Sequence, residues 1–470
     1  MKKILALILA ALMVLTMFAC AAKTEPAKEA EQTTTTEPAE ETTPEETAPA
    51  AEETTEEPAV GGTISVFATS YTDAKLEVFQ EIINDFMAET GVQVDLITPG
   101  SEGEAQLKTM MASNSLPDVW MTHGWSLLRY SEYLKVVNDQ PWFDSIDKDS
   151  LAGVMADENG NFYALGMSMS ISGLIYNKDI LNKYFALDGA KATSMDEIDN
   201  FDTLKAVADD MQARKDELGI KGAFTSAGFD SSSDWRFKTH LANLPLYYEF
   251  KDDNVTKQPE TIKGTYLPEY KNIFDLYLKD STTEPTQLSS KTGDDSTSEF
   301  SLGEAVFYQN GTWAWTDLQK AGMKADSLGM LPIYIGVKGE EKQGLATGSE
   351  NYWCINSKAS DADKKATKDF LKWVVTSKTG IKSLSSDMGF TTPFKSFSDV
   401  KSDNPLVQAA VEDQNSGKTA VSWNFTMMPS EEWKNKLGSA LLEYAQGTGD
   451  WNAVKKAFVD GWKTEYDAVH

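Results

Sequence analysis

Aromatic and carboxylate side chains are the groups through which this sequence could do chemistry. The chain holds 12 tryptophans and 72 aspartates and glutamates, but only three histidines. Flat rings stack on apolar surfaces, and carboxylates, amides and guanidinium groups hold polar ligands through directed hydrogen bonds. Residues of these types in expected turns are Tyr71, Asp73, Glu102, His123, Trp125, Trp235, Arg236, Asn310, Trp313, Glu350, Asn351 and Trp423. They favour a site that binds a ligand.

Sequence motifs typical of catalysis are absent. The sequence contains no Gly-x-Ser-x-Gly elbow, no His-Glu-x-x-His, no phosphate-binding Gly-x-x-x-x-Gly-Lys loop and no Cys-x-x-Cys pair. Three widely spaced histidines do not indicate a metal cluster. A glycoside hydrolase, which needs two carboxylates, stays open as an alternative because acidic residues are so abundant. We therefore predict a protein that is not an enzyme, with no cofactor and no metal.

The first twenty residues have the pattern of an export signal. Lys2 and Lys3 precede the apolar stretch 4–18, which is shorter than a membrane-spanning helix. Its end, Met17-Phe18-Ala19-Cys20, resembles a bacterial lipobox, which implies lipid attachment at Cys20. Ordinary signal cleavage beside an incidental cysteine is the alternative. No later segment reaches transmembrane length.

Residues 21–60 differ in composition from the rest of the chain. They consist almost wholly of Ala, Glu, Thr and Pro, and such a segment buries too little apolar surface to offset the entropy of folding. We predict a disordered, extended tether that links a lipid anchor to a folded part. The formal net charge of −29 repels phosphate backbones, so nucleic-acid binding is not expected.

Strand and helix patterns alternate from residue 61 onward. Ile64, Val66 and Ala68 alternate as in a strand, and the stretch 76–86 has helical apolar spacing. Strands at 92–96 and 117–120 flank a helix at 105–113. This order predicts a parallel sheet, whose ligands bind at the carboxyl ends of the strands. Those ends are 70–73, 100–102 and 122–125.

Four ordered stretches carry a resemblance to a known family. They are Leu116-Pro117-Asp118-Val119-Trp120; 163–165 through 176–179; Phe300 to Phe307 followed by Asn310-Gly311-Thr312-Trp313; and 355–360 leading into Ala366, Phe370 and Trp373. Together they resemble the family 1 extracellular solute-binding proteins, the carbohydrate-type receptors of ABC importers. The resemblance covers essentially all of residues 61–470.

The resemblance implies an α/β, two-lobed periplasmic-binding-protein fold of type II, each lobe a mostly parallel sheet flanked by helices. Lobe one would comprise 61–169 and 338–392, and lobe two 170–337 and 393–470. Closure would occur about the crossing segments near 168–172 and 336–338. The implied partners are membrane permease subunits, and the implied place is the extracellular face of the cell membrane, where the chain is expected to be a monomer.

The resemblance also implies a sugar ligand, whose apolar faces suit aromatic rings and whose hydroxyls suit carboxylates and amides. Trp313 matches the family's sugar-stacking tryptophan. Trp433 matches another, but it equally fits the apolar stripe of a helix. The other candidates rest on turn position alone. A peptide, a polyamine or another polar solute stays open as the ligand.

Packing is the competing interpretation for each aromatic candidate, since most tryptophans lie in protein cores. We assign Trp120, Trp373 and Trp462 to packing, and expect Cys354 to be a buried small hydrophobe. His123 could hydrogen-bond a ligand or belong to a capped turn. The C-terminal region predicts two amphipathic helices, one carrying 433–444 and the other 451–462.

Overall fold

The computed structural model describes residues 62–69, 71, 73–99, 103–138, 143, 161–226, 228–230, 233–397 and 399–470. Cys20, the tether at 21–60 and Glu102 lie outside the described residues. None of the helices that the structure describes combines the length and apolarity that a bilayer crossing requires.

The described strands form one sheet in the order β2-β1-β3-β8-β4-β6-β5, with β7 paired to β4 and β9 paired to β8. Their bounds are β1 Thr63–Phe67, β2 Gln93–Ile97, β3 Val119–Thr122, β4 Leu165–Asn177, β5 Gly222–Phe224, β6 Ala305–Gly311, β7 Leu328–Leu331, β8 Gln343–Ile355 and β9 Thr419–Ser422.

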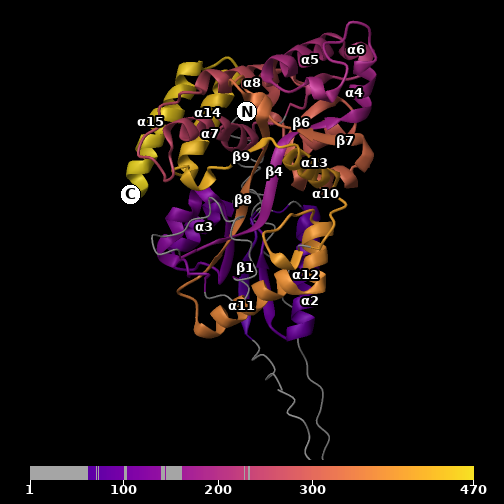
Figure 1. The fold of residues 1–470 in the computed structure, drawn as a ribbon. Helices are drawn as coiled ribbons and strands as arrows, with labels where there is room; N and C mark the ends of the chain where they lie inside the picture. Colours follow the sequence, from indigo (N-terminus) through magenta and orange to yellow (C-terminus); the bar gives the residue numbers. More distant parts are fainter. Residues whose placement is uncertain are drawn as a thin grey trace, which may run out of the picture. The chain divides into compact units, whose positions relative to one another are not determined.

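Helices cover the two ends of this sheet (Figure 1). The α-helices are α2 Asp73–Thr90, α3 Gly103–Ala112, α4 Lys178–Phe185, α5 Phe201–Ala213, α6 Lys215–Leu218, α7 Asn243–Asp253, α8 Leu267–Lys279, α9 Gly293–Ser301, α10 Trp315–Lys320, α11 Asp361–Thr376, α12 Lys378–Lys382, α13 Pro405–Asn415, α14 Glu431–Ala445 and α15 Trp451–Val469. Shorter or non-α turns are the 3-10 helices η2 Gly124–Tyr133, η5 Met195–Glu197, η7 Pro285–Ser290, η8 Thr312–Ala314, η9 Ala325–Ser327, η10 Glu340–Lys342, η12 Lys395–Phe397 and η13 Phe425–Met427, and the π-helices η6 Arg236–Leu241 and η11 Ser383–Asp387.

The sheet is mixed rather than mostly parallel. The predicted parallel part is confirmed, because β1 pairs in parallel with both β2 and β3. In contrast, β8 runs antiparallel to β3, and β4 runs antiparallel to β6, β7 and β8. The difference arises because the long strands β4 and β8 run in opposite directions. The strands on either side of this pair therefore cannot all share one direction.

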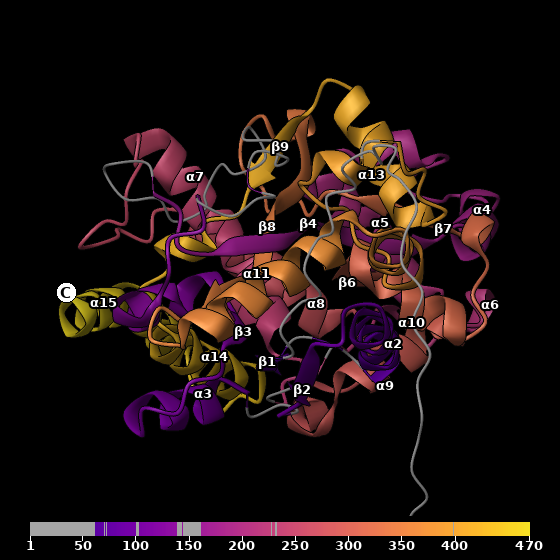
Figure 2. The same cartoon turned by 90° about the horizontal axis from the view of Figure 1, so that it is seen from below.

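The buried side chains divide into separate cores, which define two lobes. Lobe one is built on β1, β3, α2 and α11, with Phe79, Trp120 and Phe370 in its core. Lobe two is built on a large core and a smaller cluster, which respectively include Phe307 and Tyr308. Figure 2 shows α11 and β8 from below. The two-lobed α/β fold expected from the sequence is confirmed.

Strands β4 and β8 belong to both lobes. Their register runs from Leu165 opposite Trp353 to Ser172 opposite Ala346. On β8, Leu345 packs in the smaller cluster of lobe two, whereas Trp353 packs in the core of lobe one. The strand pair is therefore the structural link between the lobes, as Figure 1 shows. The exact lobe boundaries stay a prediction.

The C-terminal helices α14 and α15 form as expected from their apolar spacing. Ser430 caps α14 by accepting a hydrogen bond from the backbone nitrogen of Trp433 at 3.0 Å, and Asp450 caps α15 in the same way. Trp433 is fully buried, packs on Phe458 and Trp462, and donates from Nε1 to the carbonyl of Phe458 at 2.9 Å. Trp433 is therefore a core residue.

Candidate functional site

Seven rings from four separate segments of the chain form what we call the aromatic cluster. His240 lies at its centre, with its ring centroid 4.8 Å from that of Trp235, 5.7 Å from Trp313, 5.0 Å from Trp423 and 4.9 Å from Phe425. The ring centroid of Trp125 lies 5.8 Å from that of Phe425, and His123 stacks on Trp125, which adds both rings to the cluster. Five of the seven rings were among the sequence-predicted site residues.

Trp313 connects the two lobes. Its ring packs against the cores of both lobes and keeps part of its surface exposed. From lobe one, Nζ of the buried Lys75 donates to the carbonyl of Trp313 at 2.9 Å. The ring lies directly over Gly311, where any Cβ would overlap it. The Asn-Gly-x-Trp sequence therefore places a flat ring on a bare backbone at the end of β6.

Trp423 is held in a similar way. It follows β9 and stacks on Phe425, with a centroid distance of 4.7 Å and an interplanar angle of 28°. A Cβ at Gly348 would meet the Cβ of Trp423 at 2.8 Å, so this glycine admits the tryptophan against strand β8. Trp423 is 7% exposed.

The π-helix η6 explains why helical spacing in the sequence does not predict His240 as a site residue. Residues five positions apart on an α-helix point about 140° away from each other. The wider turn of a π-helix brings Trp235 and His240 to one side, where their rings touch. Single π-turns occur often at functional sites. Burial lowers the pKa of His240 to about 3, so its imidazole stays neutral at physiological pH.

His123 and Trp125 bring lobe one to the cluster. Their rings stack at 4.5 Å with an interplanar angle of 17°. Nδ1 of His123 lies 2.7 Å from Oε1 of Glu350 on β8. Burial alone would lower the pKa of His123, but the hydrogen bond and charge of Glu350, helped by Glu104, outweigh burial and raise it.

Helix α14 of lobe two meets the same turn of lobe one. Trp125 donates from Nε1 to Glu431, and Nζ of Lys434 lies 4.1 Å above the Trp125 ring. Nζ of Lys434 also lies 3.0 Å from Glu431. Burial would raise the pKa of Glu431, but Lys434 and the more distant cations His123 and Lys238 lower it, so this carboxylate is ionised.

Three buried polar atoms at the cluster have no protein partner among the described residues. They are Oε2 of Glu350, Nε1 of Trp423 and Nδ1 of His240. Leaving such groups unpaired costs about 1–3 kcal/mol each. Unpaired atoms beside stacked rings are what a polyhydroxylated ligand could satisfy, because each hydroxyl both donates and accepts.

The other sequence-predicted residues lie elsewhere. Tyr71 packs in the core of lobe one, 5.2 Å from Phe79 and 5.9 Å from Phe390, and burial raises the pKa of its hydroxyl. Asp73 is exposed at the start of α2. Glu102 lies outside the described residues.

Three further predicted residues lie close to the cluster without adding a ring to it. Arg236 is 3% exposed, and its guanidinium group lies 4.8 Å from the ring of Trp235 and donates to the hydroxyl of Tyr308 at 3.0 Å. Asn310 accepts from the backbone of Gly311 at 2.9 Å. Asn351 has a left-handed backbone with φ 58°.

The structure also describes the four residues that the sequence assigns to packing. Trp120, Trp462 and Cys354 are fully buried, which confirms that assignment. Trp373 is partly buried against Phe86 and donates to Glu89 at 2.9 Å. Within the described residues, no group of three or more histidines, cysteines and carboxylates could hold a metal ion.

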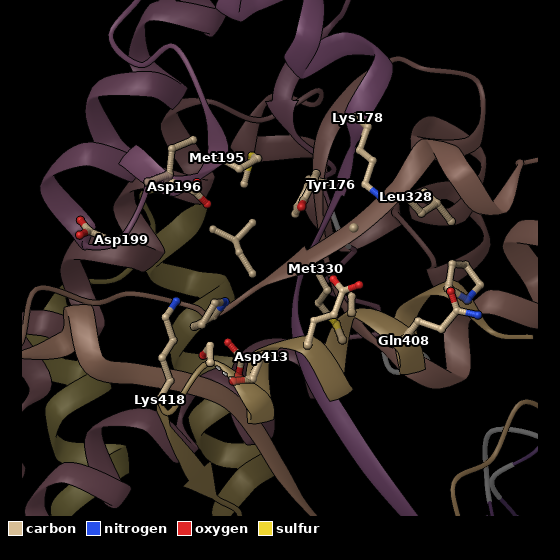
Figure 3. Close-up of a pocket in the computed structure, with 18 of the residues that line it drawn as sticks. Tyr176, Lys178, Met195, Asp196, Asp199, Leu328, Met330, Gln408, Asp413 and Lys418 are labelled. Atoms are coloured by element: carbon tan, nitrogen blue, oxygen red, sulfur yellow. Dashed lines mark hydrogen bonds between the residues drawn. The ribbon is translucent and has the colours of Figure 1, made fainter. Parts of the chain in front are cut away.

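A second feature of lobe two is a cavity of about 710 Å³, shown in Figure 3. It is lined by residues of η5, β7 and α13, together with Tyr176 and Lys178 at the junction of β4 and α4. None of the seven rings of the aromatic cluster is among its lining residues. The two sites are therefore separate.

Two lobes joined by crossing strands, with an aromatic cluster contributed by both, define a solute-binding protein of the type II periplasmic fold. Solved structures share this fold. A sugar transport protein of Bacillus licheniformis in complex with stachyose has a TM-score of 0.67 at 20% identity, covering 87% of this chain and 100% of that one. A chitin oligosaccharide binding protein has a TM-score of 0.69 at 18% identity, covering 87% and 99%.

Comparison of sequences identifies the family. The profile described as bacterial extracellular solute-binding protein matches residues 81–415, and this chain belongs to that family. The melibiose/raffinose/stachyose-binding protein MelE of Bacillus subtilis (strain 168) is 31% identical over 205 residues. That stretch is 43% of this chain and 45% of MelE, so the chain matches less than half the length of this relative.

Proposed function

We propose that this chain is the substrate-binding component of an ABC importer and that it captures a sugar or oligosaccharide between its two lobes. The aromatic cluster is the observation that carries the proposal. Rings of both lobes meet there beside Glu350, Trp423 and His240, and each of these three holds a buried polar atom that has no partner within the described part of the chain. MelE and the stachyose complex are relatives with sugar ligands.

The sugar would lie on the open side of the cluster. Trp235, His240 and Trp313 keep part of their surface exposed, whereas Phe425, which packs on His240, is 1% exposed. Ring faces would stack on the C–H faces of the sugar. Glu350 would accept from a hydroxyl, and Trp423 would donate to one.

Lobe closure would couple capture to transport. Because the site draws on both lobes, a ligand gains its full set of contacts only when they close. The closed form would be recognised by membrane permease subunits with their own ATPase. Cys20 would carry the lipid that anchors the chain to the extracellular face of the cell membrane, and residues 21–60 would act as the tether. The chain would have no enzymatic activity.

Intrinsic tryptophan fluorescence of the full chain, titrated with raffinose, stachyose, maltose and monosaccharides, tests the proposal. We expect a saturable change with one class of sugar and a matching rise in melting temperature. A response to peptides or polyamines alone would overturn the sugar ligand. Cleavage of an added oligosaccharide would overturn the binding function itself.

A further inference from the structure

The cavity of lobe two has the size of a small-molecule site. Its volume of about 710 Å³ lies within the usual range of roughly 300–1,000 Å³ for ligand pockets. Its walls come from distant parts of the sequence. Figure 3 shows Asp196, which precedes α5, on one side and Asp413 of α13 on the opposite side.

Three of the buried and half-buried lining residues form what we call the floor of the cavity. They are Tyr176, Met195 and Met330, and they supply one aromatic ring and two thioethers. The Tyr176 ring lies against the backbone of Gly329, where a Cβ of any larger residue would overlap it. An aromatic face attracts cations, and thioethers adapt to flexible alkyl chains.

The rim of the cavity is strongly acidic. Seven lining residues carry carboxylates and two carry ammonium groups. None of these seven acids forms an ion pair within the described part of the chain; they are Asp196, Asp199, Asp326, Glu341, Asp403, Glu412 and Asp413. Some helix acids elsewhere do have a lysine partner one turn away, as in Lys205–Asp209 and Lys463–Asp467. The acids of the rim lack such partners, so seven carboxylates gather around one cavity without local neutralisation by ion pairs.

Carboxylates of the rim act electrostatically on the side chain of Tyr176. Burial raises the pKa of the Tyr176 hydroxyl, and the charges of Glu412 and Asp196 raise it further. Carboxylates from α13 and from η5 thus act on one side chain at the centre of the cavity. A cation in this position would be stabilised by both walls at once.

We propose that this cavity binds a small organic cation whose ammonium groups are joined by an apolar chain. The ammonium groups pair with the acids of the rim, and the alkyl chain lies on Tyr176, Met195 and Met330. A neutral ligand of the same length lacks the charge interactions, and an anion is repelled. This site is independent of the sugar site proposed at the aromatic cluster.

Isothermal titration of the full chain with diaminohexane tests the proposal, with hexanediol as the neutral ligand of equal length. We expect saturable binding of one diamine per chain and no binding of the diol. Glu412→Gln and Tyr176→Leu should each weaken diamine binding by about tenfold, equivalent to about 1.4 kcal/mol. Tyr176→Phe keeps the ring and should bind like the unmodified chain.

Glu81→Gln provides the matched control, since Glu81 is also exposed on a helix but lies in lobe one on α2. It removes the same charge and should leave diamine binding unchanged. Equal weakening by Glu81→Gln would show a general effect of net charge and overturn the site, as would equal binding of the diol or absence of saturable diamine binding. Sugar affinity, measured on the same variants, should not change, so failure of one proposal is distinguishable from failure of the other.

Discussion

Nδ1 of His123 lies 2.7 Å from Oε1 of Glu350, although 227 positions separate the two residues in the sequence. The contact joins the turn after β3 to the strand that links the lobes. The second carboxylate oxygen of Glu350, Oε2, is buried and has no partner among the described residues. Glu350 thus holds the aromatic turn of lobe one with one oxygen and presents the other at the proposed sugar site.

This pair should make stability depend on pH. The folded protein raises the pKa of His123, so the paired imidazolium stabilises the fold fully below the ordinary pKa of about 6.5. That contribution is lost as the pH rises through the raised pKa. Glu350→Gln should remove this part of the pH dependence, which thermal unfolding between pH 5 and 9 would measure. Identical pH profiles of the two proteins would contradict the assignment.

Trp313→Ala should weaken sugar binding by about 30-fold, or about 2 kcal/mol, because it removes the ring that touches both lobes. The melting temperature should fall only modestly, since the ring is partly exposed. Calorimetric titration with the sugar found for the unmodified chain is the measurement. Trp373→Ala, which removes a partly buried ring of α11, serves as the control. Unchanged affinity in Trp313→Ala would remove the central residue of the proposed site.

Gly311→Ala should weaken the same binding without altering any polar group. The added methyl group would overlap the Trp313 ring and approach the carbonyl of Ile171 at 2.6 Å. The ring must then leave its position. Gly417→Ala is unsuited as a control because its φ of 80° strains any other residue. Gly62→Ala is suited, since its Cβ would meet Ala366 at an ordinary 3.8 Å. A crystal structure of Gly311→Ala with Trp313 unmoved would refute this expectation.

Glu432→Gln should favour the open arrangement of the lobes. Glu432 on α14 accepts from Arg129 of lobe one at 2.8 Å and also pairs with Lys108. Because Glu432 is 40% exposed, the expected effect is at most about 1 kcal/mol and should shrink with added salt. Small-angle scattering of the ligand-free chain at low and high salt would detect it. Asp467→Asn, which breaks a pair within α15, should leave the scattering unchanged.

Trp433→Ala should destabilise the protein by about 3–5 kcal/mol, because it empties a fully buried volume and breaks the bond from Nε1 to Phe458. Chemical denaturation would measure the loss. Molecules that remain folded should bind sugar normally. A selective loss of affinity with little loss of stability would return Trp433 to the binding site.

The sequence by itself determined the local elements and the class of fold. Alternating apolar residues specified β1 and β2, helical spacing specified α2, α14 and α15, and four ordered motifs indicated two lobes. These patterns are readable because burial on one face imposes a period on the residues that form it. The Asn-Gly-x-Trp motif also predicted Trp313 as a residue of the binding site.

Only the tertiary structure decided which candidates meet. Trp433 fills a core, whereas Trp423 belongs to the aromatic cluster, although only ten positions separate them in the sequence. His240 became central because a π-helix turned it toward Trp235. The direction of β4 and β8 made the sheet mixed. Such outcomes depend on contacts between residues far apart in the chain, and the free energy of those contacts has no counterpart in local residue patterns.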